Sequence, residues 1–127
     1  QTLAQNLRLG KPDASDDELW QVLDKVALKD WAANQPEGLN TALGEYGMAV
    51  SGGQARRIAL ARLLLTPKTV LMLDEPFAGL DATNRERLWQ HLVERQRDGL
   101  LIVVTHQVWQ DPNSVESLHL AEPVVVA

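Results

Sequence analysis

Two short apolar runs that each end in polar residues constrain the fold of this chain most. Residues 70–75 read VLMLDE, and residues 100–106 read LLIVVTH. Continuous apolar runs of this length, rich in aliphatic residues, are typical of strands buried on both faces of a parallel sheet. We therefore expect buried strands at 70–73 and 100–105, each delivering chemically active side chains at its carboxyl end.

The segment between the two runs predicts how the strands are connected. Residues 83–97 have the spacing of an amphipathic helix, with Leu88, Leu92 and Val93 on its inner side. A strand, a helix and a second strand in this order form a parallel crossover unit. This half of the chain is therefore predicted to be α/β.

The first part of the chain, up to about residue 47, has a helical and more polar pattern. Leu3, Leu7 and Leu9 predict a short helix that ends near Gly10. Residues 15–18 (SDDE) predict a capping box, in which the serine caps the next helix and the glutamate reaches back to the serine. The apolar face of that helix is formed by Leu19, Val22, Leu23 and Val26.

Composition excludes several classes of function. The net charge of −5 argues against a general nucleic-acid-binding protein, which would be basic. The absence of cysteine excludes disulfides, thiolate catalysis and cysteine-ligated metals. No apolar run approaches the ~20 residues that span a bilayer. The sequence starts at Gln1 rather than at methionine, so we expect a piece of a longer protein.

Residues 51–54 (SGGQ) stand directly before a predicted helix over 51–65. The N–H groups and the positive dipole end of a helix N-terminus attract phosphate, and glycine lets an anion approach the backbone closely. The alternative for this turn is an ordinary N-capped helix. Arg56, Arg57 and Arg62, taken alone, are expected to lie on a solvated helix face, with phosphate ligands as the alternative.

Four further residues are candidates for chemistry near the strand ends. In α/β sheets, ligands bind beyond the carboxyl ends of the strands. There Asp74 is placed to hold Mg²⁺ through its water shell, and Glu75 to act as a general base on water. His106 could contact a terminal phosphate, with a structural histidine as the alternative. Asp81 either joins this site or only caps the helix that follows.

The combined order SGGQ, DEP, GLD and TH resembles the nucleotide-binding domain of ABC transporters. The resemblance implies a partial P-loop NTPase fold, with a helical subdomain over 1–49 followed by the second half of the parallel-sheet core over 50–127. It also implies ATP and Mg²⁺ as ligands, and a second ABC subunit as a head-to-tail partner. In such a pair the ATP is held mainly by the opposite subunit.

The resemblance assigns roles residue by residue. The signature motif, which presents N–H groups to the γ-phosphate of ATP, corresponds to Ser51, Gly52, Gly53 and Gln54. Asp74 corresponds to the Walker B aspartate and Glu75 to the catalytic glutamate. Asp81 belongs to the D-loop, and His106 is the switch histidine.

Several family motifs have no counterpart in this sequence. They are the Walker A loop GxxxxGK[ST], the aromatic residue that stacks on adenine, and the Q-loop glutamine, which Gln1 does not represent. The lysine and backbone cradle of the Walker A loop supply most of the phosphate affinity. This chain alone is therefore expected to bind ATP weakly and to hydrolyse essentially none.

Some segments resemble particular exporters. Residues 2–10, 36–41 and 43–45 look like exporters that fuse a membrane domain to the ATPase. Residues 56–62 and 77–82 look most like the CydC subfamily, one half of the heterodimeric CydDC exporter required for cytochrome bd assembly, whose cargo is described as thiols or haem. The parent protein would then act at the cytoplasmic face of the bacterial inner membrane, with a heterodimeric partner and no nucleic acid.

Two functions other than an exporter motor are alternatives. A DNA-repair or chromosome-organising ABC ATPase is disfavoured, because residues 1–49 show no heptads and the chain is acidic. A non-catalytic interaction module remains an alternative for the isolated piece. Residues 115–120 and 122–126 predict two short final strands, with an Ala-Glu-Pro turn that departs from the exporter pattern.

Overall fold

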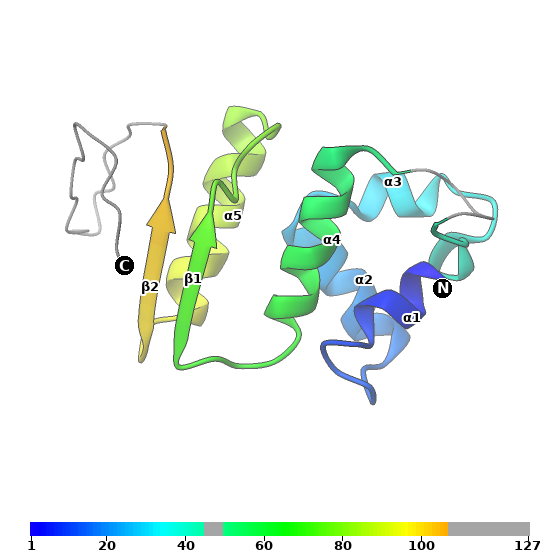
Figure 1. The fold of residues 1–127 in the computed structure, drawn as a ribbon, viewed down its shortest axis with the longest axis horizontal. Coiled ribbons are helices and arrows are strands. Elements are labelled where there is room, and N and C mark those ends of the chain that lie inside the picture. The colour runs from blue at the N-terminus through cyan, green and yellow to red at the C-terminus, as the bar shows by residue number, and fades with distance from the viewer. Residues whose placement is uncertain (45–49, 107–127) are drawn as a thin grey trace, which may run out of the picture.

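The computed structural model describes residues 1–44 and 50–106 of the chain (Figure 1). The final strands expected after residue 107 lie outside this part. No helix among the described residues is long and apolar enough to cross a membrane. In chain order the elements are α1 (Leu3–Leu7), α2 (Asp16–Lys25), α3 (Lys29–Ala33), the 3₁₀ turn η1 (Gly38–Asn40), α4 (Gly52–Leu64), β1 (Val70–Asp74), α5 (Ala82–Arg95) and β2 (Leu100–Val104).

The first helix is short but closed at its start by a complete capping box. The Thr2 hydroxyl accepts from the Gln5 N–H at 3.1 Å, and the Gln5 side chain accepts from the Thr2 N–H at 2.9 Å. Leu3 and Leu7 are fully buried, as expected. The helix ends at Leu7 rather than near Gly10, so Leu9, the third leucine used to predict it, lies beyond the helix and is 60% exposed.

The capping box expected at the start of α2 is only half formed. Ser15 accepts a hydrogen bond from the Glu18 N–H at 3.2 Å. The Glu18 carboxylate does not reach back; it accepts from the Lys11 ammonium at 2.8 Å. A charged partner makes a stronger hydrogen bond than a neutral backbone N–H, which explains the choice. The apolar face of α2 is buried as expected.

Helix α4 stands between the helical part and the sheet (Figure 1). It contacts α1 and α2, and Ile58, Leu60, Ala61 and Leu64 are buried. The chain after α1 passes so close to α4 that a Cβ built at Gly10 would lie 2.3 Å from the Arg62 carbonyl oxygen. Only glycine fits this crossing without a backbone shift.

The two strands pair in parallel, as the strand–helix–strand pattern predicts. Val70 lies opposite Leu100 and Asp74 opposite Val104. Helix α5 runs along one side of the sheet (Figure 1), and Leu88 and Leu92 of this helix are fully buried. Burial of these two leucines confirms the expected inner face of the helix.

The expectation of strands buried on both faces is wrong for the described residues. Leu71 and Leu73 are buried, whereas Val70 is 55% and Met72 is 65% exposed. Alternate residues of a strand point to opposite faces. Among the described residues only one face of the sheet is covered, so the other set of side chains remains accessible.

Contacts at the start of the strands hold their register. The Leu100 N–H donates to the Thr69 carbonyl at 2.8 Å. The buried Gln96 amide donates to the Lys68 carbonyl at 3.0 Å and to the Leu100 carbonyl at 3.2 Å. A Cβ at Gly99 would lie 2.4 Å from the Thr69 oxygen, so glycine permits this approach. The strand ends are thereby aligned.

The close crossing of α1 and α4 leads to a stability prediction. Gly10→Ala should lower the free energy of unfolding by about 1–3 kcal/mol, because the added methyl overlaps a backbone oxygen that cannot move alone. The midpoint of urea denaturation measures the change. Gly52→Ala is the control, since its methyl would meet nothing within 4 Å. Equal midpoints for the two variants would contradict the predicted overlap.

The half-buried His91 of α5 leads to a prediction on pH. Burial is the main cause that lowers the pKa of His91 below 6.5, and the positive charges of Lys25 and Arg87 lower it further, against Asp24. The unfolded chain therefore binds the proton more readily, and stability should fall as the pH drops through about 6.5. His91→Gln should lose less stability over this range in urea titrations. Identical pH slopes for variant and wild type would exclude the effect.

Candidate functional site

The parallel register brings the carboxyl ends of β1 and β2 to one edge. Asp74 ends β1 opposite Val104, the last residue of β2. Glu75 follows the first strand, and Thr105 and His106 follow the second. Glu75 and His106 lie just beyond the paired strand ends. The register of the two strands therefore places these two residues near each other, as predicted.

Glu75 is held by both its backbone and its side chain. Its N–H donates to the Val104 carbonyl at 2.7 Å, which extends the strand ladder. Its carboxylate accepts from the His106 N–H at 2.6 Å and from the Thr105 hydroxyl at 3.3 Å. The His106 Nε2 lies 3.6 Å from the same carboxylate. The structure thus brings Glu75 and His106 together.

The backbone of Glu75 is unusual. Its φ angle is +48°, in the left-handed region that non-glycine residues rarely adopt. Such conformations persist only where surrounding contacts hold them, and they concentrate at functional sites. The hydrogen bonds to and from the β2 end supply those contacts. The His106 side chain itself is 98% exposed and accessible to a ligand.

Asp74 is exposed, and its carboxylate has no hydrogen-bond or ion-pair partner within residues 1–44 and 50–106. The same residues contain no cluster of three or more histidine or acidic side chains that could hold a metal. This donor set suits Mg²⁺ that arrives with a nucleotide, because that ion usually takes one or two carboxylates and completes its shell with phosphates and water.

The signature turn, residues 51–54, forms the capped helix start that was one of the two interpretations of SGGQ. The Ser51 hydroxyl oxygen accepts from the Gln54 N–H at 3.1 Å, and the Gln54 side chain accepts from the Ser51 N–H at 3.0 Å. The first N–H groups of a helix have no intrahelical acceptor. The capping box pairs the N–H of Gln54 and leaves the N–H groups of Gly52 and Gly53 available.

Space in front of this turn suits an anion. A Cβ built at Gly52 would meet nothing within 4 Å, and Ser51 and Gly52 are both exposed. The Ser51 oxygen is an acceptor in the capping box, so its hydroxyl hydrogen can still be donated. The capped-helix and phosphate-binding interpretations therefore do not compete for the same atoms.

Asp81 acts as the N-cap of α5. One of its carboxylate oxygens accepts from the Asn84 N–H at 2.7 Å. Gly79, two residues earlier, has a φ of +79° and allows the sharp turn that leads from the strand end to the helix. The capping alternative for Asp81 is therefore confirmed, and its exposed side chain keeps one oxygen for other contacts.

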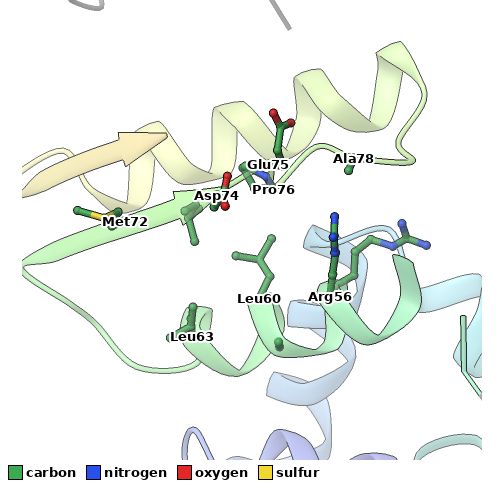
Figure 2. Close-up of a pocket in the computed structure, with 11 residues that line it drawn as sticks. Arg56, Leu60, Leu63, Met72, Asp74, Glu75, Pro76 and Ala78 are labelled. Atoms are coloured by element: carbon green, nitrogen blue, oxygen red, sulfur yellow. The ribbon is translucent and has the colours of Figure 1, made fainter. Parts of the chain in front are cut away.

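A cavity of about 390 Å³ lies between α4 and β1. Figure 2 shows Leu60 and Leu63 of α4 on one side, with Met72 and Asp74 of β1 on the other. The Glu75 carboxylate extends away from α4 in this view. The two neighbouring acidic side chains therefore point in different directions. Asp74 lies on the cavity wall, and the Glu75 carboxylate lies at the end of β2.

One hydrogen bond and one buried side chain were not predicted from the sequence. Thr105 stands in the sequence only as part of a strand end, yet its hydroxyl donates to Glu75. Arg57 was expected on a solvated face, but it is half-buried and its Nε is fully covered; Arg56, its neighbour, is exposed as expected. The adjacency of Thr105 to His106 was a usable signal for the first. No local signal indicated the second.

Comparisons with known proteins agree with this arrangement. The ABC transporter family model matches residues 1–78. The chain is 42% identical over 113 residues to the transport ATP-binding protein AarD of Providencia stuartii, covering 89% of this chain and 19% of that protein. It is 41% identical over 107 residues to the glutathione/L-cysteine transport system ATP-binding/permease protein CydC of Escherichia coli strain K12, covering 84% and 18%.

The protein CydD of the same E. coli system is 39% identical over 107 residues, covering 84% of this chain and 18% of CydD. Among solved structures, a bacterial Atm1-family ABC exporter with ATP bound matches with a TM-score of 0.71 and 28% identity, covering 84% of this chain and 18% of that chain. The chain thus spans about a fifth of the length of these relatives. It has the ABC ATPase form of the P-loop NTPase fold and belongs to the ABC transporter family, among the exporter-type ATP-binding domains.

Proposed function

We propose that the chain forms part of the ATP-hydrolysing motor of a membrane exporter. Residues 1–49 would be the helical subdomain, and residues 50–127 the signature helix with the Walker B, D-loop and H-loop half of the core. The observation that carries the proposal is the Glu75 carboxylate held 2.6 Å from the His106 N–H at the sheet edge. The Walker A half would come from elsewhere in the parent protein.

In this proposal Glu75 is the general base of ATP hydrolysis. Its carboxylate offers about four acceptor sites, and two donors from the end of β2 occupy part of them. The remaining sites can accept the proton of a water molecule as its oxygen attacks the γ-phosphorus and the bond to the β-phosphate breaks. The exposed His106 ring would contact the γ-phosphate and orient that water.

The other roles follow the exposed polar groups. Asp74 would hold the Mg²⁺ that accompanies ATP, and the ion would neutralise charge on the phosphates. The free N–H groups of Gly52 and Gly53 and the hydroxyl of Ser51 would donate to the γ-phosphate of an ATP held by a second ABC subunit, in a head-to-tail pair. Exposure of this turn supports contact with a partner rather than with its own core.

We further propose that the parent protein is a CydC-like exporter subunit for thiols or haem, at the cytoplasmic face of a bacterial inner membrane. Support comes from segments 56–62 and 77–82 and from the two relatives described as glutathione/L-cysteine transport proteins. AarD is equally similar, so the transport assay below decides between cargoes. The heterodimeric partner would resemble the second subunit of that system.

The role of Glu75 is tested in the full-length transporter. Glu75→Gln should lower the ATPase kcat by at least about 10²-fold, because the amide cannot take the proton of the attacking water. ATP-bound dimers should accumulate and be visible by size-exclusion chromatography. Glu86→Gln is the matched control, since Glu86 is an exposed helix residue that accepts from Gln90. An unchanged kcat for Glu75→Gln would remove the base role.

The cargo is tested with inverted membrane vesicles that contain the full-length protein and its partner subunit. ATP-dependent uptake of radiolabelled cysteine or glutathione is expected, and Glu75→Gln vesicles should show none. Haem is supplied in a parallel arm, with stimulation of the ATPase rate as the readout. ATP hydrolysis without a response to any of the three compounds would overturn the CydC-like proposal and leave the motor proposal standing.

A further inference from the structure

Arg57 of α4 lies against two turns that are far apart in sequence. A methyl built at Gly53, in the first turn of the same helix, would lie 3.4 Å from the Arg57 Nη1. A methyl built at Gly79, in the turn before α5, would lie 3.6 Å from the same nitrogen. One guanidinium nitrogen is thus within van der Waals reach of both positions.

No carboxylate of the described residues accounts for this placement. The Arg57 Nε is buried and has no hydrogen-bond partner in that part of the chain. Burying a donor of this kind without a partner costs free energy, and such a group calls for an explanation. The side chain lies beside two backbone positions that carry no Cβ, and a methyl at either position would come into contact with it.

Both turns belong to motifs that the family resemblance assigns to the nucleotide site. Gly53 belongs to the signature turn, and Gly79 stands two residues before Asp81, the N-cap of α5. We infer that Arg57 is a positioning residue whose planar guanidinium sets the spacing between the signature turn and the Asp81 turn. This inference rests on the proposed ATPase function, and it gives Arg57 no direct contact with ATP.

The neighbouring arginine provides a matched comparison. Arg56 has the same charge and helix propensity and lies on the same helix, but it is exposed, and its atoms are not among those that a Cβ built at Gly53 or Gly79 would meet. Loss of Arg56 therefore removes one positive charge from α4 without removing the link between the two turns. A loss of activity that occurs on substitution of Arg57 but not of Arg56 therefore reflects the spacing between the two turns.

The test uses the full-length transporter in proteoliposomes. Arg57→Met should lower the ATPase kcat about tenfold, because the two turns lose their fixed spacing, while KM for ATP changes less than about twofold. Arg57→Lys should recover little, since an ammonium lacks the planar fork. Arg56→Met should match wild type. Equal kcat values for Arg57→Met and Arg56→Met would overturn the inference.

A double-mutant comparison separates positioning from a general loss of structure. Gly53→Ala places a methyl against Arg57, whereas the methyl of Gly52→Ala points into open space. The effect of Gly53→Ala on kcat should therefore differ at least about threefold between the wild-type and Arg57→Met backgrounds, and that of Gly52→Ala should not. Additive effects at both glycines, or a loss of kcat that follows only a lower melting temperature, would overturn the positioning role.

The Glu75→Gln variant is measured in the same preparations. Its failure to reduce turnover would overturn the base role in the proposed function, whichever way the Arg57 variants behave. Loss of turnover in Glu75→Gln together with wild-type kinetics in Arg57→Met would overturn the positioning role alone. The two failures are therefore distinguishable.

Discussion

The hydrogen bond from the Glu75 N–H to the Val104 carbonyl, 2.7 Å long, is the interaction on which the site depends. It continues the pairing of β1 with β2 by one residue past the end of β1. The chain then turns with φ at +48°, and the Glu75 carboxylate meets the N–H of His106 and the hydroxyl of Thr105. Backbone pairing, which does not depend on side-chain identity, thereby orients the Glu75 carboxylate.

The signature turn likewise relies on backbone groups, here at a helix start. A capping box satisfies the N–H groups of Ser51 and Gln54 through their own side chains. Those of Gly52 and Gly53 remain for a ligand, and glycine, which has no side chain, keeps the approach open. In the proposed function, helix capping and phosphate binding therefore use different N–H donors of one turn. A serine followed by two glycines and a glutamine supplies both.

The parts of the fold that depend on local pattern were predicted from the sequence. The helix from residue 52 and the two parallel strands follow from periodicity and caps. Where a side chain could choose between partners, prediction failed, since Glu18 bonds Lys11 instead of completing its cap. The exposure of Met72 was also missed, because burial depends on what covers the second face of the sheet.

The burial of Arg57 could not be predicted from the sequence. Its neighbour Arg56 has the same charge and lies on the same helix, and no local rule separates them. Their surroundings differ because the turn at Gly79, contributed by a different element, passes over one and not the other. Glycine at positions 53 and 79 then has a second use besides backbone freedom. The missing Cβ at both positions leaves room for one guanidinium beside two turns, and the positioning role inferred for Arg57 rests on that placement.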